Sequence, residues 1–215
     1  MLRLLYRIIR KCLVLDVTRL LCVVFEEIPG LTSPEADYEF RFADRKTLES
    51  VADRKKVGLN DELLERLDDV QLPQNYCGAL FHNDRLVSYA WFAVDRIEAR
   101  HNRVSDHPNS GVSVAIAASD LFIYAAFTHP EYRGQNLFPT LLKCASKEFE
   151  KRGFRRFVST TEWTNTAARC AFKKAGFADL GMIWKSSVGT HSLTNGPKAA
   201  ERYSIYVGKP VGGLA

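Results

Sequence analysis

The most constraining feature of the sequence is an apolar run at residues 121–128 that leads through a turn into a helical pattern. Pro130 and Gly134 mark the turn. The apolar positions after it recur at the spacing of one helical face: Leu141, Leu142, Ala145 and Phe149. A strand–turn–helix junction aims several backbone N–H groups at one point, and the helix dipole adds positive potential there. The residues therefore predict an anion site with Arg133 at its mouth. An ordinary surface turn with an exposed arginine explains the same residues.

The rest of the chain alternates between strand-like and helix-like segments. Strands are expected at residues 17–25, 38–42, 77–81, 86–94, 112–116, 154–161, 177–184 and 203–207. Further helices are expected at residues 46–56, with Asp44 as the N-cap, 61–70 and 165–175. Residues 95–111 and 189–198 are predicted as polar loops, the first of them a lid or a connector. At 215 residues the chain fits one α+β domain, an α/β sandwich built on a mixed sheet.

The charge and the cysteines exclude two classes of function. The net charge is +5, but residues 1–20 contribute +4, so the remaining 195 residues contribute only +1. A nucleic-acid-binding domain concentrates basic residues on its folded body, so no nucleic-acid partner is expected. The cysteines are odd in number, scattered and without a CxxC pair: Cys12, Cys22, Cys77, Cys144 and Cys170. They predict reduced thiols in a cytoplasmic protein and no metal site.

Residues 1–16 are predicted to form a basic amphipathic helix appended to the main domain, residues 17–210. The basic residues fall on one helical stripe: Arg3, Arg7, Arg10 and Lys11. Charges interrupt the apolar stretch too often for a membrane span, and it lacks the features of a secretory signal. Such a helix can pack on its own domain or lie on an anionic membrane surface. Peripheral contact with the inner face of the membrane therefore stays open.

Two sequence blocks resemble one known family. The run HPEYRGQNLFPTLL at residues 129–142 resembles the acyl-CoA-binding signature of GNAT acetyltransferases, PEYRGxGxG or PEYRGxGxA followed by an apolar helix. Residues 165–177, NTAARCAFKKAGF, resemble the N-xx-A-xxx-Y-xxx-GF helix of the same family. One predicted helix and one predicted strand separate the blocks, as the family requires. Together the blocks cover roughly residues 120–180.

The resemblance implies a largely antiparallel central sheet with helices on both faces. It implies acetyl-CoA or another acyl-CoA as co-substrate, no metal, and transfer of the acyl group to a primary amine. The pyrophosphate of the donor would be held by Arg133, Gly134, Gln135, Asn136, Leu137 and Phe138. Phe127 and Thr128 would pair their backbone with the pantetheine arm, as an added strand does. Asn165 would hydrogen-bond the pantetheine or lie near the thioester, and Phe172 belongs to the same donor site.

Three residues depart from the family pattern. Asn136 stands where the family usually has glycine, and Phe138 where it has glycine or alanine. Asparagine tolerates a positive φ better than other non-glycine residues, so the loop is expected to keep its shape. Phe172 replaces a tyrosine that often protonates the departing thiolate. A thiol with a pKa of about 8.5 can leave as a thiolate, so the departure weakens catalysis more than binding.

The general base has three candidates. An attacking amine must lose its proton, and a carboxylate, histidine or tyrosine can accept it through water. Tyr124 lies in the middle of the apolar run, Asp120 at its start, and Glu162 after the following strand. For each, a packed tyrosine or an exposed acid is the simpler explanation. His129 is expected to face solvent.

The sequence thus favours an acyl-CoA-dependent N-acyltransferase that acts on a small-molecule or peptide amine. A GNAT fold that binds acyl-CoA as a weak or inactive regulatory module is the alternative. A membrane-surface enzyme acting on a lipid or cell-envelope amine is a third hypothesis. The acceptor, the acyl length and a homodimeric state remain open.

Overall fold

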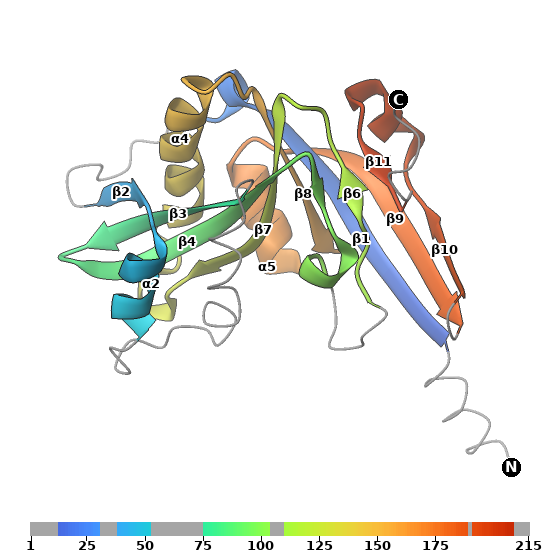
Figure 1. The fold of residues 1–215 in the computed structure, drawn as a ribbon, viewed down its shortest axis with the longest axis horizontal. Helices are drawn as coiled ribbons and strands as arrows, with labels where there is room; N and C mark the ends of the chain where they lie inside the picture. The colour runs from blue at the N-terminus through green and yellow to red at the C-terminus, as the bar shows by residue number, and fades with distance from the viewer. Residues whose placement is uncertain (1–12, 31–37, 53–74, 104–109, 189–190, 209–215) are drawn as a thin grey trace, which may run out of the picture.

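The chain forms one large sheet in the computed structural model, which describes residues 13–30, 38–52, 75–103, 110–188 and 191–208 (Figure 1). Its strands are β1 (Leu13–Val24), β2 (Glu39–Phe42), β3 (Asn75–His82), β4 (Arg85–Val94), β7 (Asp120–Thr128), β8 (Arg156–Glu162), β9 (Ala178–Val188) and β10 (His191–Asn195). They lie in the order β10-β9-β1-β8-β7-β4-β3-β2. Every neighbouring pair is antiparallel except β7 and β8, which are parallel. The expected mixed, largely antiparallel sheet is confirmed.

Both faces of the sheet are covered, so its central strands are apolar without alternation. Helices α4 (Leu137–Glu150) and α5 (Thr166–Lys174) pack on one face. The other face carries α2 (Arg45–Ala52), the 3-10 helix η6 (Lys198–Tyr203) and a small sheet of β5 (Arg96–Ile97), β6 (Val114–Ala115) and β11 (Tyr206–Val207). Eight consecutive residues of β4 are buried. This continuous burial is expected of a strand enclosed on both sides.

The first strand of the chain lies inside the sheet. β1 pairs antiparallel with β8 on one side and with β9 on the other. Figure 1 shows β1, β9 and β10 side by side at one end of the sheet and β2 with α2 at the other. β1 begins at Leu13, so residues 13–16 belong to a strand rather than to the end of the predicted N-terminal helix. The rest of that predicted helix, residues 1–12, lies outside the described residues.

Local chemistry explains several of the turns. Asn83 and Asp84 both have a positive φ (50° and 61°) and join β3 to β4 through two residues. Such two-residue hairpins favour Asn and Asp because these residues tolerate the left-handed region. Asp44 caps α2 as expected, because its Oδ1 accepts the Thr47 N–H at 2.8 Å.

Three sequence predictions differ from the structure. The predicted loop at residues 189–198 contains β10, because pairing with β9 supplies the order that its polar sequence does not indicate. The predicted strand at residues 203–207 is reduced to β11, preceded by η6. Residues 95–111 include β5 and the 3-10 helix η4 (Ala99–His101). The predicted helix at residues 61–70 lies outside the described residues.

A buried ion pair joins the beginnings of the two parallel strands. Asp120 on β7 accepts a hydrogen bond from the Arg156 guanidinium on β8, which also donates to the Tyr203 carbonyl at 2.7 Å. The Asp120 side chain is 2% exposed and that of Arg156 15%. Burial raises the pKa of Asp120, and the hydrogen bond from Arg156 opposes this shift. Through these contacts Arg156 of β8 holds β7 and η6 together at one end of the sheet.

Asp120→Ala is expected to lower the free energy of unfolding by about 3–5 kcal/mol, because the Arg156 guanidinium would stay buried without its carboxylate. Urea denaturation measures this loss. Glu49→Ala is the control, because it breaks the exposed Arg45–Glu49 pair on α2, which should contribute less than about 1 kcal/mol. Equal losses in the two variants would contradict the structural role of Asp120.

Candidate functional site

The sheet divides between β7 and β8. Their parallel pairing runs from Asp120↔Arg156 to Ile123↔Ser159 and then stops. Beyond this point β7 stays paired with β4 as far as Thr128, whereas β8 stays paired with β1 as far as Glu162. The two halves of the sheet therefore separate, and their strand ends face the space between them.

A bulge reshapes β7 where the separation begins. The pairing of β4 with β7 shifts between Tyr89 and Trp91, so Ala125 and Ala126 both lie opposite Ala90. Ala125 has a φ of 48°, which is uncommon for a residue with a side chain. Bulges of this kind leave one residue outside the ladder and redirect the backbone. Here the redirected residues line the cavities described below.

The turn after β7 presents a series of free amides. The 3-10 helix η5 (Pro130–Tyr132) ends at Arg133, and α4 begins at Leu137. In the part of the chain that the structure describes, none of the five amides of residues 134–138 donates a hydrogen bond. The first bonded amide of the helix is that of Thr140, which donates to the Asn136 carbonyl at 3.1 Å. Five free amides at a helix N-terminus form a site for an anion.

Asn136 adopts the left-handed conformation that this turn requires. Its φ is 59°, and that of Gly134 is 81°. The expectation that asparagine tolerates a positive φ here is confirmed. Lys174 of α5 approaches the Asn136 Oδ1 at 3.5 Å, which adds a positive charge beside the amides.

A cavity of about 360 Å³ lies against this turn and α5. Eight of the residues predicted to hold the donor line it: Phe127, Thr128, Arg133, Gly134, Asn136, Leu137, Phe138 and Phe172. Gln135 and Asn165 are engaged elsewhere. The Gln135 Oε1 accepts a hydrogen bond from the Tyr38 hydroxyl at 2.8 Å, and Asn165 caps α5 by accepting the Ala168 N–H at 3.0 Å.

A second cavity of about 230 Å³ lies between the separated strands. Its walls are residues 123–126 of β7, residues 159–161 of β8, and three residues at the end of η4: His101, Asn102 and Arg103. Ala126, Ala168 and Phe172 line both cavities. The two cavities therefore meet at the bulge, with Phe172 between them.

The η4 wall of the second cavity is fixed to the sheet. Asn102 donates to the Val112 carbonyl at 2.8 Å and accepts from the Thr160 hydroxyl at 2.7 Å. Gly111 packs so closely on η4 that an added Cβ would lie 2.3 Å from the Ala99 carbonyl oxygen. The Gly111 N–H donates a hydrogen bond to the Asp16 carboxylate at 3.1 Å, and the Gly111 carbonyl accepts one from the Lys185 ammonium at 2.6 Å. Burial lowers the pKa of Lys185, and the charge of Asp16 opposes this shift.

The three predicted catalytic residues lie in different places. Tyr124 is 5% exposed and lines the second cavity. Asp120 lies at the closed end of β7 in the ion pair with Arg156, and Glu162 is exposed at the end of β8. Neither Asp120 nor Glu162 lines the two cavities.

The sequence did not indicate the three residues at and directly after the end of η4 that line the second cavity. His101, Asn102 and Arg103 belong to a polar segment that carries no recognisable motif. The one signal available was the length of the segment 95–111, which indicated a functional loop.

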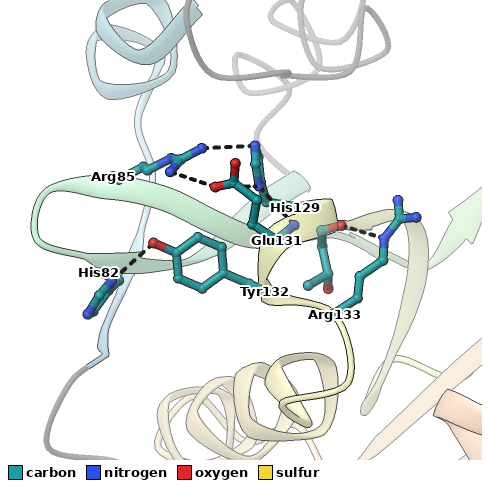
Figure 2. A network of polar contacts seen from close by, with 7 residues as sticks. His82, Arg85, His129, Glu131, Tyr132 and Arg133 are labelled. Carbon is teal, nitrogen blue, oxygen red and sulfur yellow. Dashed lines mark hydrogen bonds and ion pairs between the residues drawn. The ribbon is translucent and has the colours of Figure 1, made fainter.

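A polar network surrounds the beginning of the turn after β7. Figure 2 shows Arg85 of the β3–β4 hairpin reaching the Glu131 carboxylate at 3.0 Å and the His129 Nε2 at 3.1 Å. The Tyr132 hydroxyl lies 3.1 Å from the His82 Nδ1, and Arg133 donates to the Thr128 carbonyl at 3.1 Å. His129 is 7% exposed, so the expectation that it faces solvent is wrong. Its ring is buried because Arg85 and Tyr132 pack around it.

Two last features of the described residues bear on metal ions and on membranes. Among the described residues, no group of three or more His, Cys, Asp or Glu side chains could hold a metal ion. Within the same residues, every helix is too short or too polar to cross a lipid bilayer.

The mixed, largely antiparallel sheet with helices on both faces is the fold of GNAT acetyltransferases. The profile of the acetyltransferase (GNAT) family matches residues 44–177, more than half of the sequence. The chain belongs to the GNAT acetyltransferase family. No curated protein matches the sequence.

Several solved structures share the fold. A GCN5-related N-acetyltransferase from Kribbella flavida matches at 13% identity and a TM-score of 0.52, over 87% of this chain and 64% of that one. A GNAT-family acetyltransferase from Colwellia psychrerythraea matches at 16% identity and a TM-score of 0.51, over 82% and 57%. The aminoglycoside N-acetyltransferase AAC(6')-Iy, solved in complex with CoA, matches at 18% identity and a TM-score of 0.44, over 66% and 88%. The chain thus spans less than two thirds of the first two proteins.

Arg85→Ala is expected to loosen the turn after β7, because it removes the partner of both His129 and Glu131. Hydrogen exchange at the Tyr132 and Arg133 amides should accelerate about tenfold, while the exchange of β4 amides changes little. Arg96→Ala is the control, since Arg96 pairs with Glu98 on the exposed part of β5. Unchanged exchange in Arg85→Ala would show that the network does not order the turn.

Proposed function

We propose that this protein is an N-acyltransferase that transfers an acyl group, most simply acetyl, from a CoA thioester to a primary amine. The observation that carries the proposal is the row of five unpaired amides at residues 134–138 beside a cavity that opens onto the separated strands. Membership of the GNAT acetyltransferase family supports the same activity. Solved relatives bound to CoA include AAC(6')-Iy.

The donor would occupy the first cavity. Its pyrophosphate would accept hydrogen bonds from the amides of residues 134–138, with Arg133 and Lys174 adding positive charge. The pantetheine arm would follow the end of β7 at Phe127 and Thr128, where β8 has already separated. A cavity of about 360 Å³ that is mainly apolar suits such an arm. The thioester would then lie near Ala126, where the two cavities meet.

The reaction would proceed by direct attack. The amine nitrogen, entering from the second cavity, forms a bond to the thioester carbon and generates a tetrahedral intermediate. An amide of the Ala125–Ala126 bulge would stabilise its oxyanion. The C–S bond then breaks and CoA leaves as a thiolate, which needs no acid because a thiol has a pKa of about 8.5. This route is compatible with Phe172, which packs edge-on against Phe138 at 5.1 Å and has no proton to donate.

His101 would accept the proton that the amine releases. Among the described residues that line the second cavity, it is the one whose side chain ordinarily exchanges a proton near neutral pH. Its ring lies 6.4 Å from that of Tyr124, edge to face. We assign Tyr124 to the same proton-transfer site, as a hydroxyl that orients the amine or a bridging water.

A binding module that does not turn over is the second candidate. Phe172 favours it, because this residue separates the two cavities without offering an acid. Release of free thiol from acetyl-CoA in the presence of a broad panel of amines discriminates the two functions. Steady release with any amine removes the binding-module hypothesis. Binding of acetyl-CoA without release across the panel supports it.

Asn136→Val is expected to weaken the binding of acetyl-CoA about tenfold, since a branched side chain disfavours the left-handed φ of 59° that shapes the turn. Asn136→Gly should bind as tightly as the wild type or more tightly. Isothermal titration calorimetry measures both. Failure of the wild-type protein to bind acetyl-CoA at millimolar concentration would overturn the proposed function.

His101→Gln is expected to lower kcat/KM for the amine by a factor of about 10² or more while leaving the affinity for acetyl-CoA unchanged. The loss should remove the limb of the pH–rate profile near neutrality, where imidazole gives up its proton, and leave the limb caused by the amine itself. His191→Gln, on the exposed β10, is the control. An unaltered pH profile in His101→Gln would reject His101 as the base.

A further inference from the structure

We propose that the second cavity selects an amine that also bears an acidic group, a carboxylate or a phosphate, and that Arg103 binds this group. The inference rests on the proposed acyl transfer and names the class of its acceptor. It depends on three features of the cavity: its one permanent charge, the rigidity of the wall that carries this charge, and its size.

Arg103 offers an anion-binding edge at the rim of the cavity. Its Nε donates to the Arg100 carbonyl at 3.1 Å, which anchors the guanidinium on its own turn. Its two terminal nitrogens have no partner within the described part of the chain, and Arg103 forms no ion pair there. A guanidinium held in this way presents two parallel N–H donors, the geometry that a carboxylate or a phosphate accepts.

Among the described residues that line the cavity, the only permanent charge is positive. No aspartate or glutamate occurs among the described residues that line it, and Arg103 is the one permanently charged residue among them. The remaining polar lining consists of His101, Asn102, Tyr124 and the hydroxyls of residues 159–161. A second cationic group on the acceptor would find no carboxylate among these described residues and would be repelled by Arg103. An acidic group would find its partner.

The wall that carries Arg103 is fixed before any acceptor binds. Asn102, its neighbour, is bonded to both Thr160 and Val112. Gly111, with a φ of 89°, lies so close that an added Cβ would come within 2.9 Å of the Arg103 Cα. Recognition by a preorganised group loses little entropy on binding. These contacts fix the backbone that carries the exposed Arg103 side chain, and the Nε bond to the Arg100 carbonyl anchors its guanidinium at the rim of the cavity.

The size of the cavity sets the size of the acceptor. At about 230 Å³ it is smaller than sites for drug-sized ligands, which begin at roughly 300 Å³. A small amino acid or a short amine with a phosphate is therefore the class of acceptor that fits.

Matched pairs of amines test the inference. Thiol release from acetyl-CoA is measured with amino acids against their amides, and with aminoethyl phosphate against ethanolamine. We expect kcat/KM to be at least tenfold higher for the acidic member of one pair or of both, and the pair with the larger ratio distinguishes a carboxylate from a phosphate site. Wild-type preference for the amides, for ethanolamine or for a polyamine would overturn the inference and leave the proposed acyl transfer standing.

Arg103→Gln should remove this preference by lowering kcat/KM for the acidic amine about 10- to 100-fold, with little effect on the neutral member or on the affinity for acetyl-CoA. Arg103→Lys should restore part of the preference. Arg100→Gln is the matched control, because Arg100 lies on the same turn and its side chain does not line the cavity. Equal losses in Arg103→Gln and Arg100→Gln would reject a specific contact.

Calorimetry with the same amines, on protein saturated with CoA, covers the case in which no amine is acylated. Tighter binding of the acidic amine, lost in Arg103→Gln, supports the inference without turnover. Equal binding of both members of each pair overturns it. Failure to bind acetyl-CoA at all is a separate result, because it rejects the proposed function and not the charge preference of the cavity.

Discussion

The end of the β7–β8 pairing at Ile123 and Ser159 is the constraint on which the two cavities depend. Up to that point two parallel strands share hydrogen bonds and the Asp120–Arg156 ion pair. Beyond it each strand keeps only its outer neighbour, so backbone groups that would otherwise satisfy one another are left facing a gap. A ligand with an extended polar arm can satisfy them. The ion pair at the closed end holds the two strands together at the end opposite to their separation.

The two cavities differ in how far apart in the sequence their lining residues lie. The first is built almost entirely from one continuous segment, the end of β7, the turn and the start of α4, with α5 as its far wall. The second brings together parts of β7, β8 and η4 that are distant in the sequence. Its geometry depends on contacts such as Asn102–Thr160 and on Gly111, held between Asp16 and Lys185. A short motif can therefore encode most of the first cavity, whereas the second depends on the whole fold.

This difference between the cavities explains which features of the structure could be predicted from the sequence. The anion-binding turn was predictable because Gly134, Asn136 and the helical face after them act within a few residues of one another. Most strands were predictable from their apolar runs. β10 was not, because the order of an edge strand with an exposed Leu193 comes from its neighbour β9 rather than from its own residues. The burial of His129 and the place of Arg103 beside the second cavity could not be predicted either, because each depends on a residue or strand brought near by tertiary folding.

The position of β1 has a consequence for the order in which the protein assembles. β1 is the earliest of the described strands in the sequence, yet its two neighbours, β8 and β9, begin only at Arg156 and Ala178. Closing such long loops is slow, and apolar strands are prone to aggregate until they pair with their neighbours. Residues 20–23, all buried in the finished sheet, must therefore stay without their neighbours for most of synthesis. The half of the molecule that holds β2, β3, β4 and β7 can form before β1 finds its place.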